Sequence, residues 1–241
     1  MIEKVIQRTL LILGMVLLMC AESKAGTILG NDDSVIERVR RIVEEIKIAS
    51  YPELANLKNA EIEIKLFDSP SDYFQTRFTF TSFLFKKRLR YMLRVNRNLF
   101  ASNAPDDGVR AIIAHELGHV VYYKARNRIQ LLGLARLACK GFTARFERAT
   151  DLRAISRGYS DGLKSYRLWL YRQIPAKNVM EKRRNYFSPA EIDALNLKLR
   201  AQPKLMEKWL KAPPNSLEKI EGTSVSQQLQ ATHPTIIFSL Q

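Results

Sequence analysis

The strongest signal in the sequence is the stretch Ala111-Ile112-Ile113-Ala114-His115-Glu116-Leu117-Gly118-His119-Val120-Val121. Its apolar residues predict a buried helix, and it carries the pattern His-Glu-x-x-His. Residues four positions apart lie one above the other on a helix, so His115 and His119 direct their imidazoles to the same side. One divalent cation could be held between them, with Glu116 beside it.

Zinc is the natural candidate for that cation. It accepts neutral imidazole nitrogen at roughly 2.0 to 2.1 Å, and a catalytic zinc site takes three protein ligands and leaves a fourth position for water. Bound zinc lowers the pKa of water to about 7, and Glu116 can accept the proton as the hydroxide attacks a carbonyl. This chemistry predicts peptide hydrolysis with Glu116 as general base. The alternative, two core histidines and an exposed glutamate, is disfavoured because a glutamate among buried apolar residues is costly without a purpose.

The third ligand is expected from a pair of acids further along the chain. Glu147 lies 28 residues after His119, and Asp151 follows one helical turn later. We expect Glu147 to coordinate the metal, and Asp151 to accept a hydrogen bond from the far nitrogen of a ligating imidazole, that of His115. Taken alone, two acids at this spacing are typical of a solvent-exposed helix face. The two acids are assigned to a metal site only because the His-Glu-x-x-His motif precedes them.

These residues, together with the stretches 95–100 and 154–163, carry a resemblance to a known family. Over residues 60–170 the chain resembles the gluzincin metallopeptidases, and within them the CAAX prenyl endopeptidases and HtpX-like heat-shock proteases. The resemblance implies zinc held by two histidines and a glutamate, and an endopeptidase or chaperone-like protease role acting on a polypeptide substrate. It also implies an α+β, zincin-like fold, with a small mixed sheet, a metal-binding helix and a second helix carrying the glutamate.

The remaining histidine is assigned by the same resemblance. The family often carries a His-Pro pair near the end of its catalytic domain, and Thr232-His233-Pro234-Thr235 matches it. His233 is therefore expected to reach the site as an oxyanion stabiliser or an inhibitory fourth ligand; a surface-loop histidine is the alternative. The arginine-bearing helix that commonly follows is not visible in residues 236–241. An internal transmembrane helix is not visible either, so the chain resembles the soluble, exported members.

Sequence patterns also predict the elements around the metal helix. We expect a helix over 34–48, opened by a capping box from Ser34 to Glu37, and strands over 61–67, 78–83 and 90–96. The last strand is expected to be the sheet edge that pairs with an extended peptide. The metal helix is expected from 105 to 124. The leucine-rich stretch 129–140 is expected to be a core helix, with a lid or a membrane-surface contact as alternatives.

The N-terminus predicts export. Lys4 and Arg8 precede an apolar run over 9–21, which is typical of a secretory signal peptide cleaved after Ala25. Lipidation at Cys20 and an uncleaved anchor are the alternatives. We therefore expect a bacterial periplasmic or cell-envelope protein with a signal peptide (1–25), a metallopeptidase domain (26–175) and a helical extension (176–241). Within that extension, Ser188 to Glu191 has capping-box spacing.

Charge content indicates which surfaces the chain could bind, and cysteine content limits the disulfides that it could form. The chain holds 39 Lys and Arg against 24 Asp and Glu, a net charge of +15, and loss of residues 1–25 would leave +14. Such a surface favours phospholipid headgroups, acidic envelope polymers or acidic substrates, and no recognised nucleic-acid-binding motif is present. Signal cleavage would leave Cys139 as the single cysteine, which precludes an internal disulfide and is expected to be a buried thiol.

A second function remains open on the sequence alone. The chain could be a non-hydrolytic, zinc-containing envelope-binding or chaperone-like protein whose basic surface does the binding. Such a protein would hold metal but show no turnover that depends on Glu116.

Overall fold

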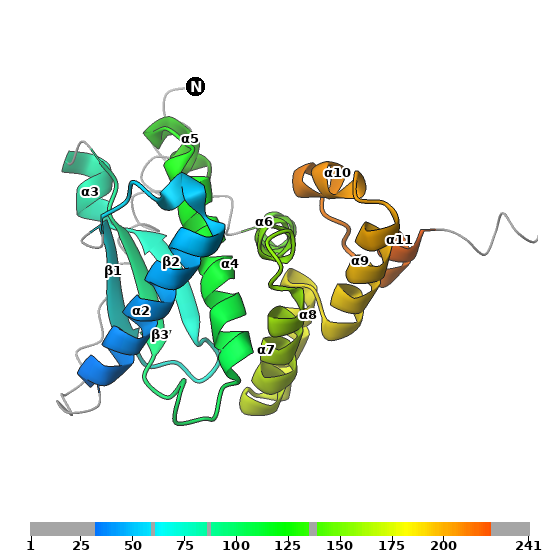
Figure 1. The fold of residues 1–241 in the computed structure, drawn as a ribbon, viewed down its shortest axis with the longest axis horizontal. Helices are drawn as coiled ribbons and strands as arrows, with labels where there is room; N and C mark the ends of the chain where they lie inside the picture. Colours follow the sequence, from blue (N-terminus) through cyan, green and yellow to red (C-terminus); the bar gives the residue numbers. More distant parts are fainter. Residues whose placement is uncertain (1–31, 59–60, 86–87, 135–138, 223–241) are drawn as a thin grey trace, which may run out of the picture.

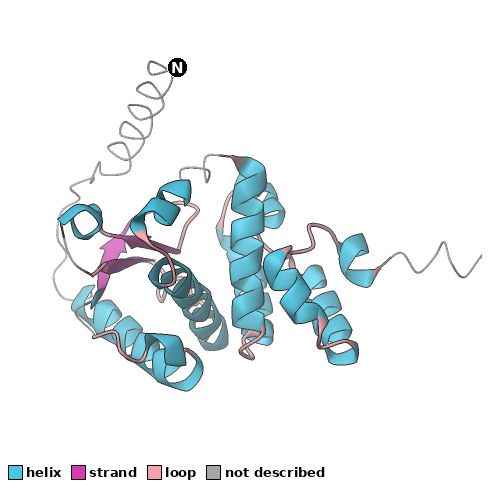
Figure 2. Cartoon of the chain, turned by 90° about the horizontal axis from the view of Figure 1, so that it is seen from above, coloured by secondary structure: helices cyan, strands magenta, loops and turns pink. Residues whose placement is uncertain are grey.

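The computed structural model describes residues 32–58, 61–85, 88–134 and 139–222. They form a mostly helical α+β protein with a small sheet at one end (Figures 1 and 2). The predicted signal peptide and His233 lie outside the described residues. In chain order the elements are α2 (Asp32–Ser50), the 3-10 turn η1 (Pro52–Leu54), β1 (Ile62–Phe67), β2 (Phe74–Phe78), α3 (Phe80–Phe85), β3 (Tyr91–Asn96), α4 (Asp106–Lys124), α5 (Arg128–Leu132), α6 (Lys140–Ile155), α7 (Ser160–Gln173), α8 (Ala176–Asn185), α9 (Pro189–Ala201), α10 (Leu205–Lys211) and α11 (Leu217–Glu221).

The sheet has the expected mixed character but not the expected edge. Its strand order is β1-β3-β2, with β1 parallel and β2 antiparallel to β3. The prediction that the last strand is an edge is therefore wrong, because β3 is central. The strand β2, which the sequence patterns did not indicate at 74–78, pairs along the side of β3 that was expected to be free. Its outer side is the sheet edge nearer to α4.

The expected strand over 78–83 is also wrong. Only Phe78 belongs to a strand, and the chain then turns into α3. Alternating aromatic residues favour a strand locally, but here Phe83 returns over Phe78, with ring centroids 5.4 Å apart. The Ser82 hydroxyl accepts a hydrogen bond from the Arg90 amide at 2.9 Å and fixes the return to β3. Tertiary contacts thus override the local alternation.

The metal-motif helix α4 is the centre of the molecule. It begins at Asp106, after Pro105, and ends at Lys124, as the sequence predicts. It packs against α2 and β2 on one side and against α6 and α7 on the other (Figure 1). Two glycines permit these close approaches: a Cβ at Gly118 would lie 2.9 Å from the Thr150 methyl group of α6, and one at Gly162 would collide with a backbone carbonyl of α4.

Helix α2 follows its predicted pattern but starts earlier. Its buried residues Val35, Val39, Val43 and Ile46 recur at helical spacing and face the core. Because the helix already includes Asp32, Ser34 lies inside it. The predicted capping box at Ser34 is therefore not the helix start.

Only part of the expected core helix over 129–140 is described, because residues 135–138 lie outside the described residues, and the described part is a short and mostly exposed helix. Helix α5 is five residues long, begins at an Asn127–Gln130 capping box and is followed by Gly133. Leu131 is its one buried residue. Cys139 occupies the N-cap position of α6 without a side-chain capping hydrogen bond and is exposed, so the expectation of a buried thiol is wrong. The Asn127–Gln130 capping box accounts for the start of α5.

Residues 176–222 form the expected helical extension, packed on α6 and α7. The predicted capping box is present: Glu191 accepts a hydrogen bond from the Ser188 amide at 2.8 Å, and Ser188 accepts one from the Glu191 amide at 3.4 Å. Buried Arg148 of α6 pairs with Glu191 at 2.7 Å and donates to three backbone carbonyls, those of Arg183, Arg184 and Pro214. These contacts attach the extension firmly to the metal-motif core.

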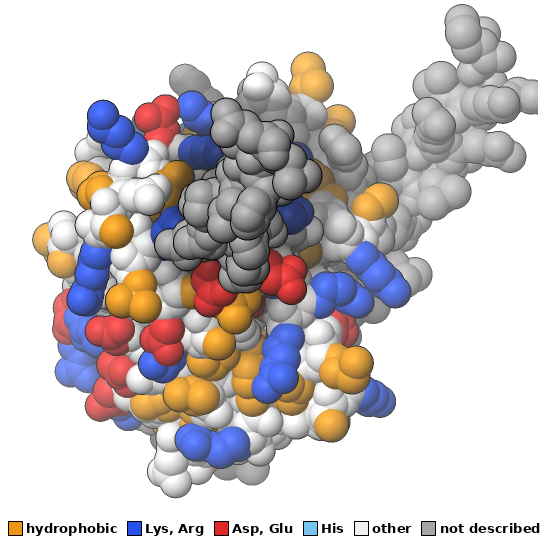
Figure 3. Space-filling model, turned by 90° about the vertical axis from the view of Figure 1, so that its right-hand side faces the viewer, with side chains coloured by type: hydrophobic (Ala, Val, Ile, Leu, Met, Phe, Trp, Pro, Cys, Tyr) orange, Lys and Arg blue, Asp and Glu red, His pale blue; other side chains and the backbone are white. Residues whose placement is uncertain are grey.

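Basic, acidic and hydrophobic side chains are interspersed on the face of the molecule that carries the extension (Figure 3). None of the helices described between residues 32 and 222 has the length and apolar character needed to cross a membrane.

Candidate metal centre

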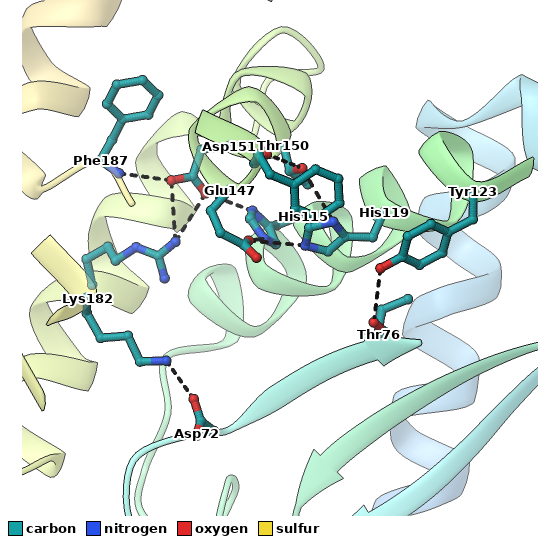
Figure 4. A network of polar contacts seen from close by, with 12 residues as sticks. Asp72, Thr76, His115, His119, Tyr123, Glu147, Thr150, Asp151, Lys182 and Phe187 are labelled. Atoms are coloured by element: carbon teal, nitrogen blue, oxygen red, sulfur yellow. Dashed lines mark hydrogen bonds and ion pairs between the residues drawn. The ribbon is translucent and has the colours of Figure 1, made fainter. Parts of the chain in front are cut away.

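Three side chains from two helices converge beside the sheet (Figure 4). His115 and His119 come from α4, and each presents its Nε2 atom at 3.2 Å from Oε2 of Glu147 on α6. Possible ligand atoms of the three residues all lie within 4.8 Å of one another. Tetrahedral coordination with bonds of roughly 2.0 to 2.1 Å separates ligand atoms by about 3.3 Å. The arrangement is therefore of the size that a single tetrahedral cation requires.

Asp151 orients the first imidazole, in the position that the sequence predicts. Its Oδ1 lies 2.7 Å from Nδ1 of His115, one turn beyond Glu147 on α6. The same carboxylate accepts a hydrogen bond from Nη2 of Arg167 at 3.1 Å and from the Phe187 amide at 3.1 Å. With Nδ1 donating to Asp151, Nε2 of His115 is left free to bind metal.

Thr150 plays the corresponding part for the second imidazole. Its hydroxyl donates to the Phe146 carbonyl at 3.0 Å, so it can accept the Nδ1 proton of His119, 3.4 Å away. That tautomer again leaves Nε2 free. The ring of Phe146 stacks on His119 with centroids 4.9 Å apart and restricts its rotation.

The charges of the site favour a cation. Burial by itself would lower the pKa of His115, but its hydrogen bond to Asp151 and the nearby Glu147 and Glu116 outweigh burial and raise the pKa to about 10. Burial would likewise raise the pKa of Glu147, yet the two imidazoles hold that pKa below its ordinary value. The acids around His115 and the imidazoles around Glu147 therefore make this position favourable for positive charge.

No family model, curated protein or solved structure matches this chain. The interpretation of the centre therefore depends on its own geometry.

Glu116 lies beside the three converging side chains and is buried in α4. Among the described residues, no group donates a hydrogen bond to its carboxylate. It lines a small cavity of about 20 Å³ together with residues of the sheet, α7 and α8. A cavity needs roughly 10 to 15 Å³ to hold one water molecule, so this space fits a water but not a peptide.

The helical extension closes the other side of this cavity. Lys182 of α8 lines it and forms an ion pair of 2.6 Å with Asp72, in the loop before β2 (Figure 4). Tyr186, which directly follows α8, also lines the cavity, with its ring centroid 5.8 Å from that of His115. We refer to the Asp72–Lys182 pair as the clasp.

The structure thus brings together His115, Glu116, His119, Glu147 and Asp151, while His233 lies outside the described residues. Four further residues contribute to the site without having been predicted from the sequence: Thr150, Arg167, Tyr186 and Phe187. Thr150 could have been suspected from its place beside Asp151 on the ligand helix. The other three carry no local signal, because they reach the site only through the packing of α7 and α8 on α6.

Proposed function

We propose that this protein is a zinc-dependent endopeptidase of gluzincin type. The observation that carries the proposal is the convergence of two imidazoles and one carboxylate at tetrahedral ligand spacing, with Glu116 directly after the first imidazole in α4 and lining a water-sized cavity. The donor set fits zinc, because two imidazole nitrogens and one carboxylate oxygen leave a fourth position open. The fold is proposed to be zincin-like, with the catalytic unit preceding the helical extension at 176–241.

Each of these residues has a distinct role in the proposed reaction. His115, His119 and Glu147 would hold zinc, which when bound acidifies a water molecule and polarises the peptide carbonyl. Glu116 accepts the proton of that water and passes it to the leaving amine. Asp151 and Thr150 keep both imidazoles in the tautomer that presents Nε2 to the metal.

Substrate binding is proposed to use the edge that the fold leaves next to α4. Since β3 is central, the edge strand on this side is β2 and not the last strand. An extended peptide would pair with β2 through main-chain hydrogen bonds. The cavity beside Glu116 is too small for a peptide, so the clasp must open when substrate enters.

The experiment that tests the proposal is Glu116→Gln, with Glu218→Gln, at an exposed position of α11, as the control. We expect Glu116→Gln to retain zinc by metal analysis and to lose about 10²- to 10⁴-fold in peptide hydrolysis, because the base is removed while the ligands remain. The control should match the unmodified protein. Hydrolysis that persists in pure Glu116→Gln protein would refute the mechanism. Zinc without turnover in the unmodified protein would favour the non-hydrolytic alternative.

We also propose that the protein is exported. Export to the bacterial periplasm or cell envelope follows from the N-terminal pattern, and the mass of the mature N-terminus would distinguish Gly26, acylated Cys20 and intact Met1. A comparison of the proteomes of cells carrying native or Glu116→Gln protein would identify the substrate.

A further inference from the structure

A concentration of apolar side chains lies where α3 and α5 meet. Among the described residues nine large hydrophobic side chains are exposed, and four of them lie on these two short helices. Phe85 and Ile129 are each 80% exposed. The helices are neighbours at one end of the molecule (Figure 1), where Arg128 donates a hydrogen bond to the Leu84 carbonyl at 3.5 Å. We call this surface the apolar tip, and it consists of Leu84, Phe85, Ile129 and Leu132.

The tip is set in a strongly basic part of the chain. Residues 73–105, which include α3, contain seven Lys or Arg and no acid. Residues 117–146, which include α5, contain six Lys or Arg and no acid. The two segments that meet at the tip thus hold none of the 24 acids of the chain. The other exposed hydrophobic residues are scattered singly over α2, α7, α8, α9 and α11.

We propose that the apolar tip docks on an anionic phospholipid surface. Protruding apolar side chains can enter the boundary between headgroups and acyl chains, while surrounding Lys and Arg are attracted to the negative headgroups. Charge complementarity favours this partner, because the two stretches of chain that contain the tip helices carry Lys and Arg and no acid of their own, and Arg88 beside α3 stays exposed although Glu61 lies 3.9 Å from it. An exposed cluster of this kind marks an interaction site in soluble proteins. This proposal does not depend on peptide hydrolysis. Of the three proposed metal ligands only His119 lies in either segment, and no proposed ligand belongs to the apolar tip.

The test places an environment-sensitive fluorophore at single positions. In the full chain with Cys20→Ser and Cys139→Ser, NBD is attached to Phe85→Cys or Ile129→Cys, and to Leu197→Cys as the matched control. Leu197 is 70% exposed on α9, far along the chain from the tip. Vesicles are made of phosphatidylcholine alone or of phosphatidylcholine with phosphatidylglycerol.

With vesicles containing phosphatidylglycerol we expect a blue shift and a severalfold gain in emission at positions 85 and 129, and neither change at 197. The shift should weaken at high salt, because part of the attraction is electrostatic. Unchanged aqueous spectra at 85 and 129 would overturn the proposal, and so would an equal response at 197 or to neutral vesicles. A blue shift without vesicles that grows with protein concentration would instead assign the tip to a second copy of the chain.

Discussion

Asp151 shows how one buried carboxylate can serve the fold and the candidate metal centre together. It accepts hydrogen bonds from His115 of α4, Arg167 of α7 and the Phe187 amide. Burial would raise its pKa, but Arg167 and His115 keep the pKa below its ordinary value, so the carboxylate stays ionised. Since Arg167 is fully buried as well, each of these two charges requires the other.

The first prediction concerns the effect of Asp151 on metal affinity. Asp151→Asn keeps the shape of the side chain but removes the negative charge that raises the basicity of His115. We expect zinc affinity to fall by about 10- to 100-fold, measured by competition with a chelator. Asp161→Asn, at an exposed position of α7, should leave the affinity unchanged. An unaltered affinity in Asp151→Asn would show that this carboxylate does not tune the centre.

The second prediction concerns the third ligand. Glu147→Ala removes the carboxylate that lies at 3.2 Å from both imidazoles, and two ligands hold zinc much less tightly than three. After dialysis, metal analysis should find most of the zinc lost. Glu181→Ala, on the exposed surface of α8, is the control. Full stoichiometry in Glu147→Ala would mean that another group completes the site.

At the level of elements, the clasp joins α8 to the loop before β2 across the cavity beside Glu116. Burial would raise the pKa of Asp72, but Lys182 and the hydroxyls of Ser71 and Ser69 lower it below its ordinary value. The pair is partly accessible to solvent and therefore contributes only modestly to stability. A contact of this strength can open when a substrate binds.

The third prediction is that weakening the clasp eases substrate entry. Lys182→Met removes the ion pair but keeps much of the aliphatic volume. We expect kcat/KM for a peptide to rise severalfold while bound zinc stays constant, measured by steady-state kinetics and metal analysis. Lys177→Met, at an exposed position of the same helix, should have no effect. A fall in kcat/KM would instead show that Lys182 contributes to substrate binding.

The fourth prediction gives the pH dependence of the clasp. A carboxyl whose pKa is lowered by folding stabilises the protein above its unfolded pKa, about 3.9, and loses that contribution as the pH falls through the folded pKa. Asp72→Asn should therefore cost roughly 0.5 to 1 kcal/mol in the free energy of unfolding at pH 6. The difference from the unmodified protein should shrink below about pH 4. Denaturant unfolding at several pH values would measure it, and a constant difference would contradict the assignment.

At the level of the whole molecule, the helical extension and the metal-motif core form one structure. Arg148 and Glu191 are both buried and tie α9 to α6, the helix that carries Glu147 and Asp151. The extension in turn supplies the Phe187 amide to Asp151 and the ring of Tyr186 to the cavity. Loss of the extension should therefore disturb the metal centre as well as the fold.

The fifth prediction is that Arg148→Met lowers the free energy of unfolding by about 3 to 5 kcal/mol, because it leaves Glu191 buried without its cation. Arg172→Met, at an exposed position of α7, should change it little. Adding Glu191→Gln to Arg148→Met should restore much of the loss, since the unpaired charge disappears while the cap at Ser188 can remain. Thermal and denaturant unfolding would measure all four proteins. An equally unstable double variant would show that the backbone contacts of Arg148, not the charge pair, hold the extension.

The sequence by itself determined those features that depend on spacing along one element. The period of a helix stacks His115 over His119 and places Asp151 one turn after Glu147, and local chemistry starts α4 after Pro105 and α9 after Ser188. Only the tertiary structure decided which groups from distant segments meet. It made β3 central, folded 80–85 into a helix, and brought Arg167, Tyr186 and Phe187 to the candidate metal centre. The reason is physical: a periodic pattern fixes the face on which a side chain lies, whereas its partner across the core depends on how the elements pack.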